Sequence, residues 1–458
     1  ASNNGETHTV QLRPGLTWQD GAPLNADDVA FTYHAIQNPM TQSPYYANWD
    51  DVNVSTAGSL TVVFKLPNPL ASFKYSLTNG IVPKHLLGKI TPDKLRSADF
   101  NTEDPVGAGP FAWQELSVEG NEPAVRQELI ALSPFAGYHG GTAKLGGLVI
   151  HAYPTAKLAE SGLLNQDIDG LAGLNTVPDN FRQKGVTIYS VPQTAETMVF
   201  FKETDPVLGD TKVRQALILA ANHQQIIDKL PYAATAEGEP LLSSQLGYDS
   251  KYKQPDYDFA AAQKLLASDG WVAGKDGILQ KGTTKLSFNL YASNNRPYSA
   301  VARALAEQWR KLGVEANVYL EDQNDFQNSL SSHNYDAVLT TIALGVDPDE
   351  YIYWDSSQAD VRSASRLNLS EVKDTNIDVP LEAGRTRDNP ELRAVKYQKF
   401  LAAWLSNEPA LALFQPRFLY FTNVNNLYNF SDGSSINDAI GRYNNVVNWE
   451  IRQTAVTD

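Results

Sequence analysis

Residues 10–31 read VQLRPGLTWQDGAPLNADDVAF, and this stretch is the most informative part of the chain about its fold. A strand-like segment, Thr7–Leu12, leads into it almost directly from Ala1. No apolar leader with a cleavage site stands in front of this strand. We therefore expect a mature or truncated chain rather than a complete gene product.

Beyond this stretch, short alternating segments are interleaved with longer amphipathic ones, which is typical of a mixed α/β protein. Apolar residues alternate over Leu60–Leu66, up to Pro67, and again over Val314–Leu320. Both patterns predict strands. The β-branched run Asp336–Ile342 predicts a third strand, buried inside a sheet.

Three helices are predicted from apolar residues that recur every three or four positions. One covers Val301–Leu312 and stops at Gly313. A second stripe extends over Val213–Leu230, before Pro231. A third helix opens at Asp388–Glu391, with a proline near its first turn. The predicted apolar face of the third helix consists of Leu392, Val395, Leu401 and Leu405.

Two turn-rich stretches divide the chain. Asp104–Pro110 has two glycines and two prolines within seven residues, which excludes regular structure and indicates a rigid connector. Glu203–Asp210 is a second stretch of turn residues and a candidate hinge.

Length and charge exclude several classes of protein. At roughly 150 residues per domain, 458 residues predict two to four domains. The composition, 42% hydrophobic and 19% charged, excludes a disordered chain. Acidic residues outnumber basic ones by 52 to 37, so the surface repels phosphate backbones and no nucleic-acid partner is expected. No run of 18 apolar residues is present, so no membrane span is expected.

The common catalytic and metal motifs are missing from the sequence. Cysteine is absent, which excludes thiol catalysis and disulfides and fits export to an oxidising compartment. The seven histidines have no zinc-site spacing, and there is no Gly-x-Ser-x-Gly. The glycine-rich loop 107–110 lacks the residues that hold phosphate. We predict no catalytic residue, no metal site and no cofactor.

Two features remain as candidates for chemistry. Asp347, Asp349 and Glu350 share one loop and could hold calcium or act as an acid and base, although a solvated loop is the better interpretation without EF-hand spacing. Aromatic residues in loop-like settings suit a cleft that holds peptide or sugar, but core packing explains most of them. These aromatics are Trp18, Tyr45, Tyr46, Trp49, Trp113, Trp271, Tyr351, Tyr353 and Trp354.

Residues 10–31 resemble the family 5 extracellular solute-binding proteins, the oligopeptide and dipeptide receptors of ABC importers, which carry a LRxGxxWxDGxPxxAxDVxF block. Further blocks follow in the family's order, and the resemblance covers nearly the whole chain. They are Val82–His85, Pro105–Phe111, Tyr138–Gly141, Asp167–Asp169, Val213–Leu217, Asp258–Trp271, Leu312–Val314 and Asp347–Asp349.

The resemblance implies an α/β, two-lobed periplasmic-binding-protein-like fold (type II, cluster C), with an extra domain inserted in one lobe. Residues 1–104 would form the extra domain, domain II, with a truncated start. Residues 105–200 and 418–458 would form lobe I, and residues 201–417 lobe III. Family members begin some tens of residues earlier and include the first strand of lobe I.

The function implied is that of an extracytoplasmic receptor, not an enzyme. It would capture a peptide or peptide-like ligand between its lobes and deliver it to the permease subunits of an ABC importer. The resemblance places it in the periplasm or at the cell surface as a monomer, with a lipid anchor upstream as its only link to the membrane.

Several ligand contacts follow from matching positions. Ser43-Pro44-Tyr45 matches a family segment whose tyrosine faces the cleft, although Tyr45 could equally pack within domain II. Thr340–Pro348 matches a GWxxDxxDP segment whose backbone pairs with the peptide as an added strand. The ligand-binding residues implied are Tyr45, Thr341, Ile342, Leu344, Asp347 and Trp354.

This sequence departs from the family's motif at the position that binds the ammonium group of the peptide. Leu344 stands at the position of that aspartate, and a buried ammonium facing leucine would lack a charge partner. Either Asp347 takes that role through a shifted loop, or the ligand has no free amino terminus. Lys202 also departs from the family, which usually has asparagine there.

Four alternatives stay open. An oligosaccharide of the cello-oligosaccharide type, stacked on aromatic walls, is the closest alternative within this fold. A nickel or metal-chelate ligand is a weaker one. A secreted hydrolase acting through Asp347 and Asp349 would need carboxylates on opposite sides of a substrate, which neighbours on one loop rarely provide. A surface receptor without a permease is the fourth.

Overall fold

The computed structural model describes residues 5–230, 232, 234–363, 365–424, 427–430 and 435–451. Pro231, the predicted end of the second helical stripe, lies outside them, as do residues 1–4 and 452–458. No helix in the described ranges is long and apolar enough for a bilayer crossing.

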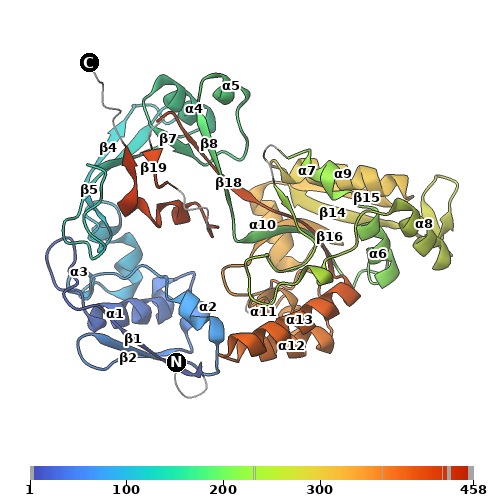
Figure 1. The fold of residues 1–458 in the computed structure, drawn as a ribbon, viewed down its shortest axis with the longest axis horizontal. Helices are drawn as coiled ribbons and strands as arrows, with labels where there is room; N and C mark the ends of the chain where they lie inside the picture. Colours follow the sequence, from blue (N-terminus) through green and yellow to red (C-terminus); the bar gives the residue numbers. More distant parts are fainter. Residues whose placement is uncertain are drawn as a thin grey trace.

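The N-terminal unit, residues 5–104, is a small sheet covered by short helices, at the lower left of Figure 1. Its strands pair in the order β1-β3-β2, all antiparallel. Trp49, Phe64 and Phe73 pack in its core. The elements are β1 (Thr7–Gln11), α1 (Ala26–Gln37), η2 (Pro39–Thr41), α2 (Tyr46–Trp49), β2 (Asn53–Thr56), β3 (Thr61–Lys65), η3 (Ala71–Ser76), α3 (Lys84–Leu87), η4 (Pro92–Ser97) and η5 (Asp99–Asn101).

The first lobe, above this unit in Figure 1, combines residues 105–193 with residues 416–424, 427–430 and 435–451. It holds two three-stranded sheets, β4-β5-β6 and β7-β18-β8, and the pair β19-β20. Its elements are β4 (Phe111–Glu119), β5 (Gln127–Pro134), β6 (Leu148–Ala152), α4 (Ala156–Asn165), β7 (Gly170–Ala172), α5 (Asp179–Gln183), β8 (Thr187–Pro192), β18 (Arg417–Thr422), β19 (Leu427–Tyr428), η8 (Ile440–Tyr443), η9 (Val446–Asn448) and β20 (Glu450–Ile451).

The second lobe, residues 194–415, lies to the right in Figure 1. Its elements up to β15 are β9 (Ala195–Phe201), α6 (Thr211–Leu219), α7 (His223–Ile227), β10 (Thr235–Ala236), η6 (Ser250–Tyr252), α8 (Phe259–Ser268), β11 (Val272–Ala273), β12 (Leu279–Lys281), β13 (Thr284–Lys285), β14 (Ser287–Ser293), α9 (Tyr298–Lys311) and β15 (Glu315–Glu321). They continue with α10 (Gln323–Ser332), β16 (Ala337–Ala343), α11 (Tyr351–Trp354), η7 (Ser356–Gln358), α12 (Thr375–Arg385), α13 (Pro390–Asn407) and β17 (Ala410–Gln415).

A six-stranded sheet in the order β10-β17-β9-β16-β14-β15 is the centre of the second lobe. Successive residues of β9 face opposite sides: Val199 and Phe201 pack with α6, α8 and α9, while Met198 and Phe200 pack toward α11, α12 and α13. All seven residues of β9 are buried. The sheet is thus covered on both faces, as its apolar strands require.

The chain passes between the two lobes twice, at residues 192–195 and 415–417, and the two passages are hydrogen-bonded to each other. The Gln193 N–H donates to the Pro416 carbonyl oxygen at 3.0 Å, and the Gln415 amide donates to the Gln193 carbonyl oxygen at 2.9 Å. The boundary predicted between residues 200 and 201 falls inside β9, which pairs along its whole length within the second lobe.

The predicted strands are confirmed as β3, β15 and β16, and the helix that stops at Gly313 is confirmed as α9. The stripe Val213–Leu230 is two helices rather than one. Asn222 separates α6 from α7, because its side chain accepts from the Gln225 N–H and starts a new helix. Glu203–Asp210 is a turn inside the second lobe and not a hinge between lobes.

The third predicted helix is confirmed as α13, which begins after the Asn389 cap with Pro390 in its first turn. Its predicted face was wrong in its first half: Leu392 and Val395 are 55% and 50% exposed, whereas the predicted Leu401 is buried. The buried residues of α13 are Arg393, Tyr397, Phe400, Leu401 and Trp404.

Arg214 on α6 ties the turn after β9 to the end of α13. The guanidinium is 1% exposed and donates to the carbonyl oxygens of Leu208 (2.9 Å), Asn407 (2.7 Å) and Glu408 (3.1 Å). It also lies 3.3 Å from a carboxylate oxygen of Glu203. One side chain thus holds three segments on one edge of the second lobe.

Arg214→Leu should lower the free energy of unfolding by about 3–5 kcal/mol, because it leaves buried carbonyls and the Glu203 carboxylate without their partner. Urea unfolding followed by tryptophan fluorescence measures the difference. Arg303→Leu, on the exposed face of α9, should change stability by no more than about 0.5 kcal/mol. Equal effects of the two substitutions would contradict the role given to Arg214.

Candidate functional site

One edge of β16 is open at its carboxyl end. β9 pairs with all of Ala337–Ala343, but β14 pairs only with Ala337–Leu339. Thr340, Thr341, Ile342 and Ala343 therefore have no strand partner on the β14 side within the described residues. Backbone groups at such an edge can pair with an added extended chain.

Thr341, a predicted ligand contact, is held in place by two hydroxyl groups. Its Oγ1 lies 2.7 Å from the Thr197 hydroxyl on β9 and 2.8 Å from the Tyr298 hydroxyl at the start of α9. These bonds fix the threonine side chain on one face of the sheet. The strand then offers its backbone, rather than this side chain, at the open edge.

A groove of about 360 Å³ follows this part of β16. Tyr353 forms part of its wall, and its hydroxyl donates to the Ala343 carbonyl oxygen at 2.7 Å. Ile342, another predicted contact, also lines it. The other lining residues are Gln327, Leu330, Ser331, Thr340, Thr341, Ala343, Ser365, Arg366, Leu367 and Leu369.

Leu344 points into the core of the second lobe. It is 6% exposed and packs in the cluster that includes Ile342 and Tyr353. Its N–H donates to the Thr194 carbonyl oxygen at 2.9 Å, which fastens the end of β16 to the passage between the lobes. In this conformation Leu344 supports the groove from behind.

Asp347 makes a bidentate ion pair with Arg393 of α13. Its two oxygens lie 2.9 Å and 2.6 Å from the two terminal guanidinium nitrogens, and both side chains are buried. Burial lowers the pKa of Arg393, and the hydrogen bonds to Asp347 and Tyr397 raise it by more. To bind a ligand's ammonium, Asp347 would have to leave Arg393 unpaired, which is costly in a buried site.

The other two predicted contacts lie in opposite settings. Trp354 is fully buried, stacked on Phe200 at 5.5 Å and edge-on to Trp404 at 5.6 Å between ring centroids. It lies beneath the groove without exposed surface. Tyr45 is 52% exposed and lines a separate cavity between the N-terminal unit and the second lobe.

That interface cavity has a volume of about 860 Å³. The Ser72 hydroxyl donates across it to Asp349 at 2.9 Å, and Arg385 lies 3.4 Å from the same carboxylate and over the Tyr351 ring. Burial raises the pKa of Asp349, and Arg385 opposes this effect. Asp347 and Asp349 thus serve separate ion pairs, and this geometry does not bring them together as a catalytic pair.

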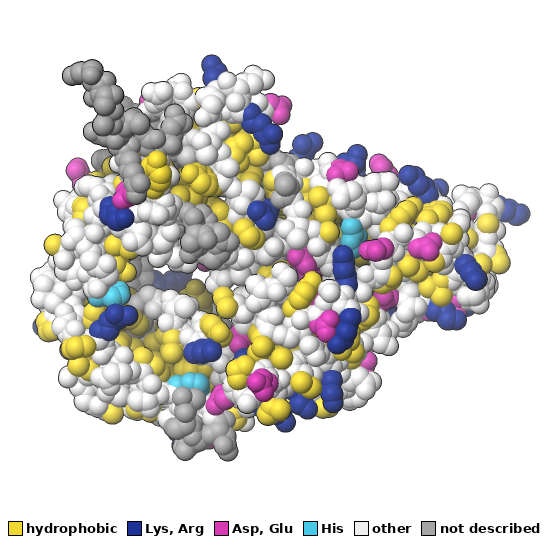
Figure 2. Space-filling view, viewed as in Figure 1, with side chains coloured by type: hydrophobic (Ala, Val, Ile, Leu, Met, Phe, Trp, Pro, Cys, Tyr) yellow, Lys and Arg dark blue, Asp and Glu magenta, His cyan; other side chains and the backbone are white. Residues whose placement is uncertain are grey.

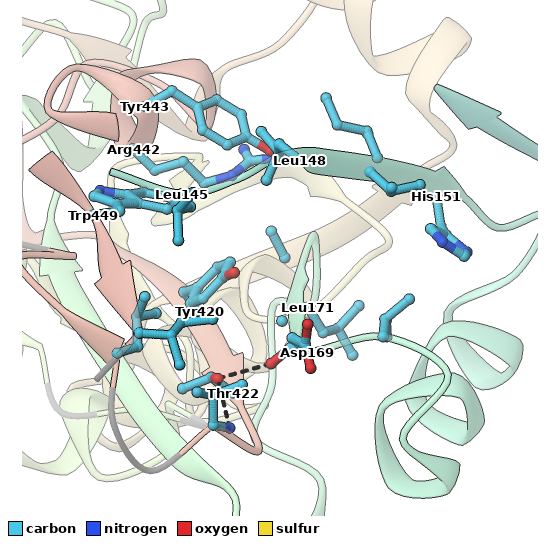
Figure 3. Close-up of a pocket in the computed structure, with 18 of the residues that line it drawn as sticks. Leu145, Leu148, His151, Asp169, Leu171, Tyr420, Thr422, Arg442, Tyr443 and Trp449 are labelled. Carbon is cyan, nitrogen blue, oxygen red and sulfur yellow. Dashed lines mark hydrogen bonds between the residues drawn. The ribbon is translucent and has the colours of Figure 1, made fainter. Parts of the chain in front are cut away.

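A third cavity, of about 470 Å³, lies in the first lobe (Figure 3). It separates β6 from β7, each of which is the last strand of its sheet. Arg442, Tyr443 and Trp449 lie on one side of it, and Tyr420 and Thr422 on the other (Figure 3). The Thr422 hydroxyl donates to the Asp169 carbonyl oxygen at 2.7 Å. Of the predicted site residues, none lines this cavity.

Four glutamates near the open edge had no counterpart in the predicted site: Glu196, Glu237, Glu239 and Glu350. All four are buried, with Glu196 and Glu350 fully so. The carboxylate oxygens of Glu196, Glu239 and Glu350 have no hydrogen-bond partner among the described residues. Glu196 stands two residues before the apolar run Met198–Phe201, and this charge within a buried strand is the sequence signal that could have revealed the cluster.

Comparison with known proteins gives relatives along almost the whole chain. Protein XP55 of Streptomyces lividans is 27% identical over 94% of this chain and 76% of its own length. The oligopeptide-binding protein AppA of Bacillus subtilis is 25% identical over 90% of this chain and 76% of its own length.

Solved structures show the same fold. NikZ of Campylobacter jejuni, in complex with Ni(L-His), matches 98% of this chain and 88% of its own, with a TM-score of 0.77 and 25% identity. The Bacillus AppA, in complex with a nonapeptide, covers the same shares with a TM-score of 0.74 and 22% identity. The mixed α/β, two-lobed fold implied by the sequence is therefore confirmed.

The model of the bacterial extracellular solute-binding proteins, family 5 (middle), matches residues 1–363 of the 458. That span contains the N-terminal unit, the crossing at 192–195, the open edge of β16 and the groove residues up to Tyr353. The chain therefore belongs to the family 5 bacterial extracellular solute-binding proteins.

Proposed function

We propose that this protein is the extracytoplasmic receptor that captures a peptide between its two lobes and delivers it to the permease of an ABC importer. The open edge of β16 at the groove carries the proposal. An extended peptide can pair with the backbone of Thr340–Ala343, which gives affinity that does not depend on side chains. The names of relatives agree, since the AppA relative is an oligopeptide-binding protein.

The division into lobes supports this function. We propose that the N-terminal unit is the extra domain attached to lobe I, and that the residues from β9 to β17 form lobe III. Two hydrogen bonds of Gln19 support the attachment. The side-chain amide of Gln19 donates to the Phe111 carbonyl oxygen at 2.7 Å, and its backbone N–H donates to the Gly107 carbonyl oxygen at 2.9 Å. The molecule is hollowed between these parts in the space-filling view (Figure 2).

In this proposal the ligand shifts the lobes toward a closed form by contacting both of them. Thr341 and Ile342 present the pairing edge, and Leu344, Asp347 and Trp354 hold that edge from behind. Tyr45 would meet the ligand from the N-terminal unit, across the interface cavity. A monomer contains all of these elements, so no second copy is needed to complete the site.

Native mass spectrometry of the purified protein, before and after mild unfolding, tests the class of ligand. We expect a released mass that fragments as a peptide, because the open edge offers backbone donors and acceptors. A released hexose oligomer or a nickel chelate would contradict the proposal.

Tyr45→Ala should weaken peptide binding by about tenfold, since it removes the exposed aromatic face that the N-terminal unit offers to the ligand from the interface cavity. Isothermal titration calorimetry with the peptide identified above measures the change in Kd. Tyr257→Ala is the matched control, because Tyr257 is 48% exposed on the second lobe and does not line the described cavities near the open edge. Equal Kd values for both variants would remove Tyr45 from the site.

A further inference from the structure

Behind the groove, four buried carboxylates from three segments lie near enough to influence one another's charge. Glu196 lies on β9, Glu237 and Glu239 follow β10, and Glu350 precedes α11. Their exposed fractions are 0%, 7%, 1% and 0%. Glutamate is almost never buried unless it is paired, so four in one region need a physical reason.

Strand pairing places two of these glutamates on either side of β17. Ala236 and Thr197 both lie opposite Phe414, and the Glu237 N–H donates to the Leu413 carbonyl oxygen at 3.1 Å. Two strand spacings separate β10 from β9, about 10 Å between backbones. Two glutamate side chains can span most of that distance. Each of the other three carboxylates also raises the pKa of Glu196, after burial itself.

The surroundings of Glu196 indicate, independently of the strand pairing, that its carboxylate lacks a hydrogen-bond or ion-pair partner. It is fully buried, and neither of its carboxylate oxygens accepts a hydrogen bond from any described residue. No lysine, arginine or histidine in the described ranges forms an ion pair with any of the four glutamates. Among the described residues, the charge of Lys253 opposes the rise in the pKa of Glu237 and Glu239, but no ion pair joins it to either carboxylate.

Such an arrangement is costly when all four groups are charged. Burial raises the pKa of Glu237 to about 7 and that of Glu239 to about 8, with Lys253 opposing both shifts. The pKa of Glu350 is also raised, by burial and by its neighbours Asp349 and Asp347, while the Gln245 side chain opposes the shift. The cluster can be neutralised in two ways, by protons or by a cation that enters it.

We propose that Glu196, Glu237, Glu239 and Glu350 receive a cationic group of the ligand, an ammonium or guanidinium on a side chain of the bound peptide. This inference rests on the proposed function. Among the described residues no three acidic or histidine side chains converge as metal ligands. Carboxylates spread over a wider space suit an organic cation, which has several N–H donors in different directions.

Two residues that line the groove are direct neighbours of glutamates in this cluster. Ile342 lines the groove and pairs in register with Glu196. Tyr353 lines it too, and its N–H donates to the Glu350 carbonyl oxygen at 3.0 Å. Tyr353 is therefore next to both the groove and Glu350, and burial and the charge of Glu350 both raise the pKa of the Tyr353 hydroxyl. A long basic side chain reaches the carboxylates when the Tyr353 ring turns and its bond to the Ala343 carbonyl breaks.

The inference is tested with the full chain and two pentapeptides, Ala-Ala-Lys-Ala-Ala and the same peptide with norleucine in place of lysine. Norleucine keeps the aliphatic side chain and removes the ammonium. By calorimetry at pH 7, the lysine peptide should bind at least tenfold more tightly. In the Glu196→Gln/Glu350→Gln variant the two Kd values should agree within twofold, while the norleucine peptide keeps its wild-type affinity.

Proton release gives a readout from the wild-type chain alone. An entering cation favours the charged carboxylates, so the lysine peptide should release protons at pH 7 and the norleucine peptide should not. Calorimetric titrations in two buffers of different ionisation enthalpy measure the number of protons released on binding. The control variant is Glu307→Gln/Glu391→Gln, two exposed glutamates of the same lobe, and it should keep the tenfold preference.

Equal affinity and equal proton release for the two peptides would overturn the cationic subsite and leave the receptor function standing. Failure of both peptides to bind would count against the receptor function itself, and against this inference with it.

Discussion

The pairing of β9 with β16 is the constraint on which the rest of the site depends. β9 enters the second lobe directly from the passage between the lobes, and all seven of its residues pair with Ala337–Ala343. Because β14 stops pairing after Leu339, this register leaves four residues of β16 open on one side. A shift of one residue would move the side chains of one strand to the opposite covered face of the sheet and disrupt the packing on both faces. The hinge and the binding edge are therefore set by a single register.

The loop after β16 contains three acidic residues, Asp347, Asp349 and Glu350, whose charges the fold has to accommodate. Asp347 joins it to α13 through Arg393, and Asp349 joins it to the N-terminal unit through Ser72. Glu350, from the same loop, is buried without a hydrogen bond for its carboxylate among the described residues. Three acidic residues within four positions thus have three different environments. A structural pair, a contact between units and an unpaired group all come from one short segment.

Sequence patterns predicted the strands correctly, because the alternation of apolar residues in β3 and β15 reflects the local environment of each strand. The face of α13 could not be predicted in this way: Arg393 is buried only because Asp347, 46 residues away, pairs with it. The open edge at Thr340–Ala343 was implied by resemblance and not by periodicity. Leu344 and Trp354 were assigned to the ligand, and their burial depends on packing against α13, which no local pattern contains.

Hydrogen–deuterium exchange with and without a bound peptide tests the central claim most directly. The account predicts slower amide exchange in Thr340–Ala343, where the peptide pairs with β16, and near Tyr45. Exchange in β6 and β7, around the cavity of the first lobe, should stay unchanged. Slower exchange confined to β6 and β7, with none at β16, would contradict the account and place the ligand in the cavity of Figure 3.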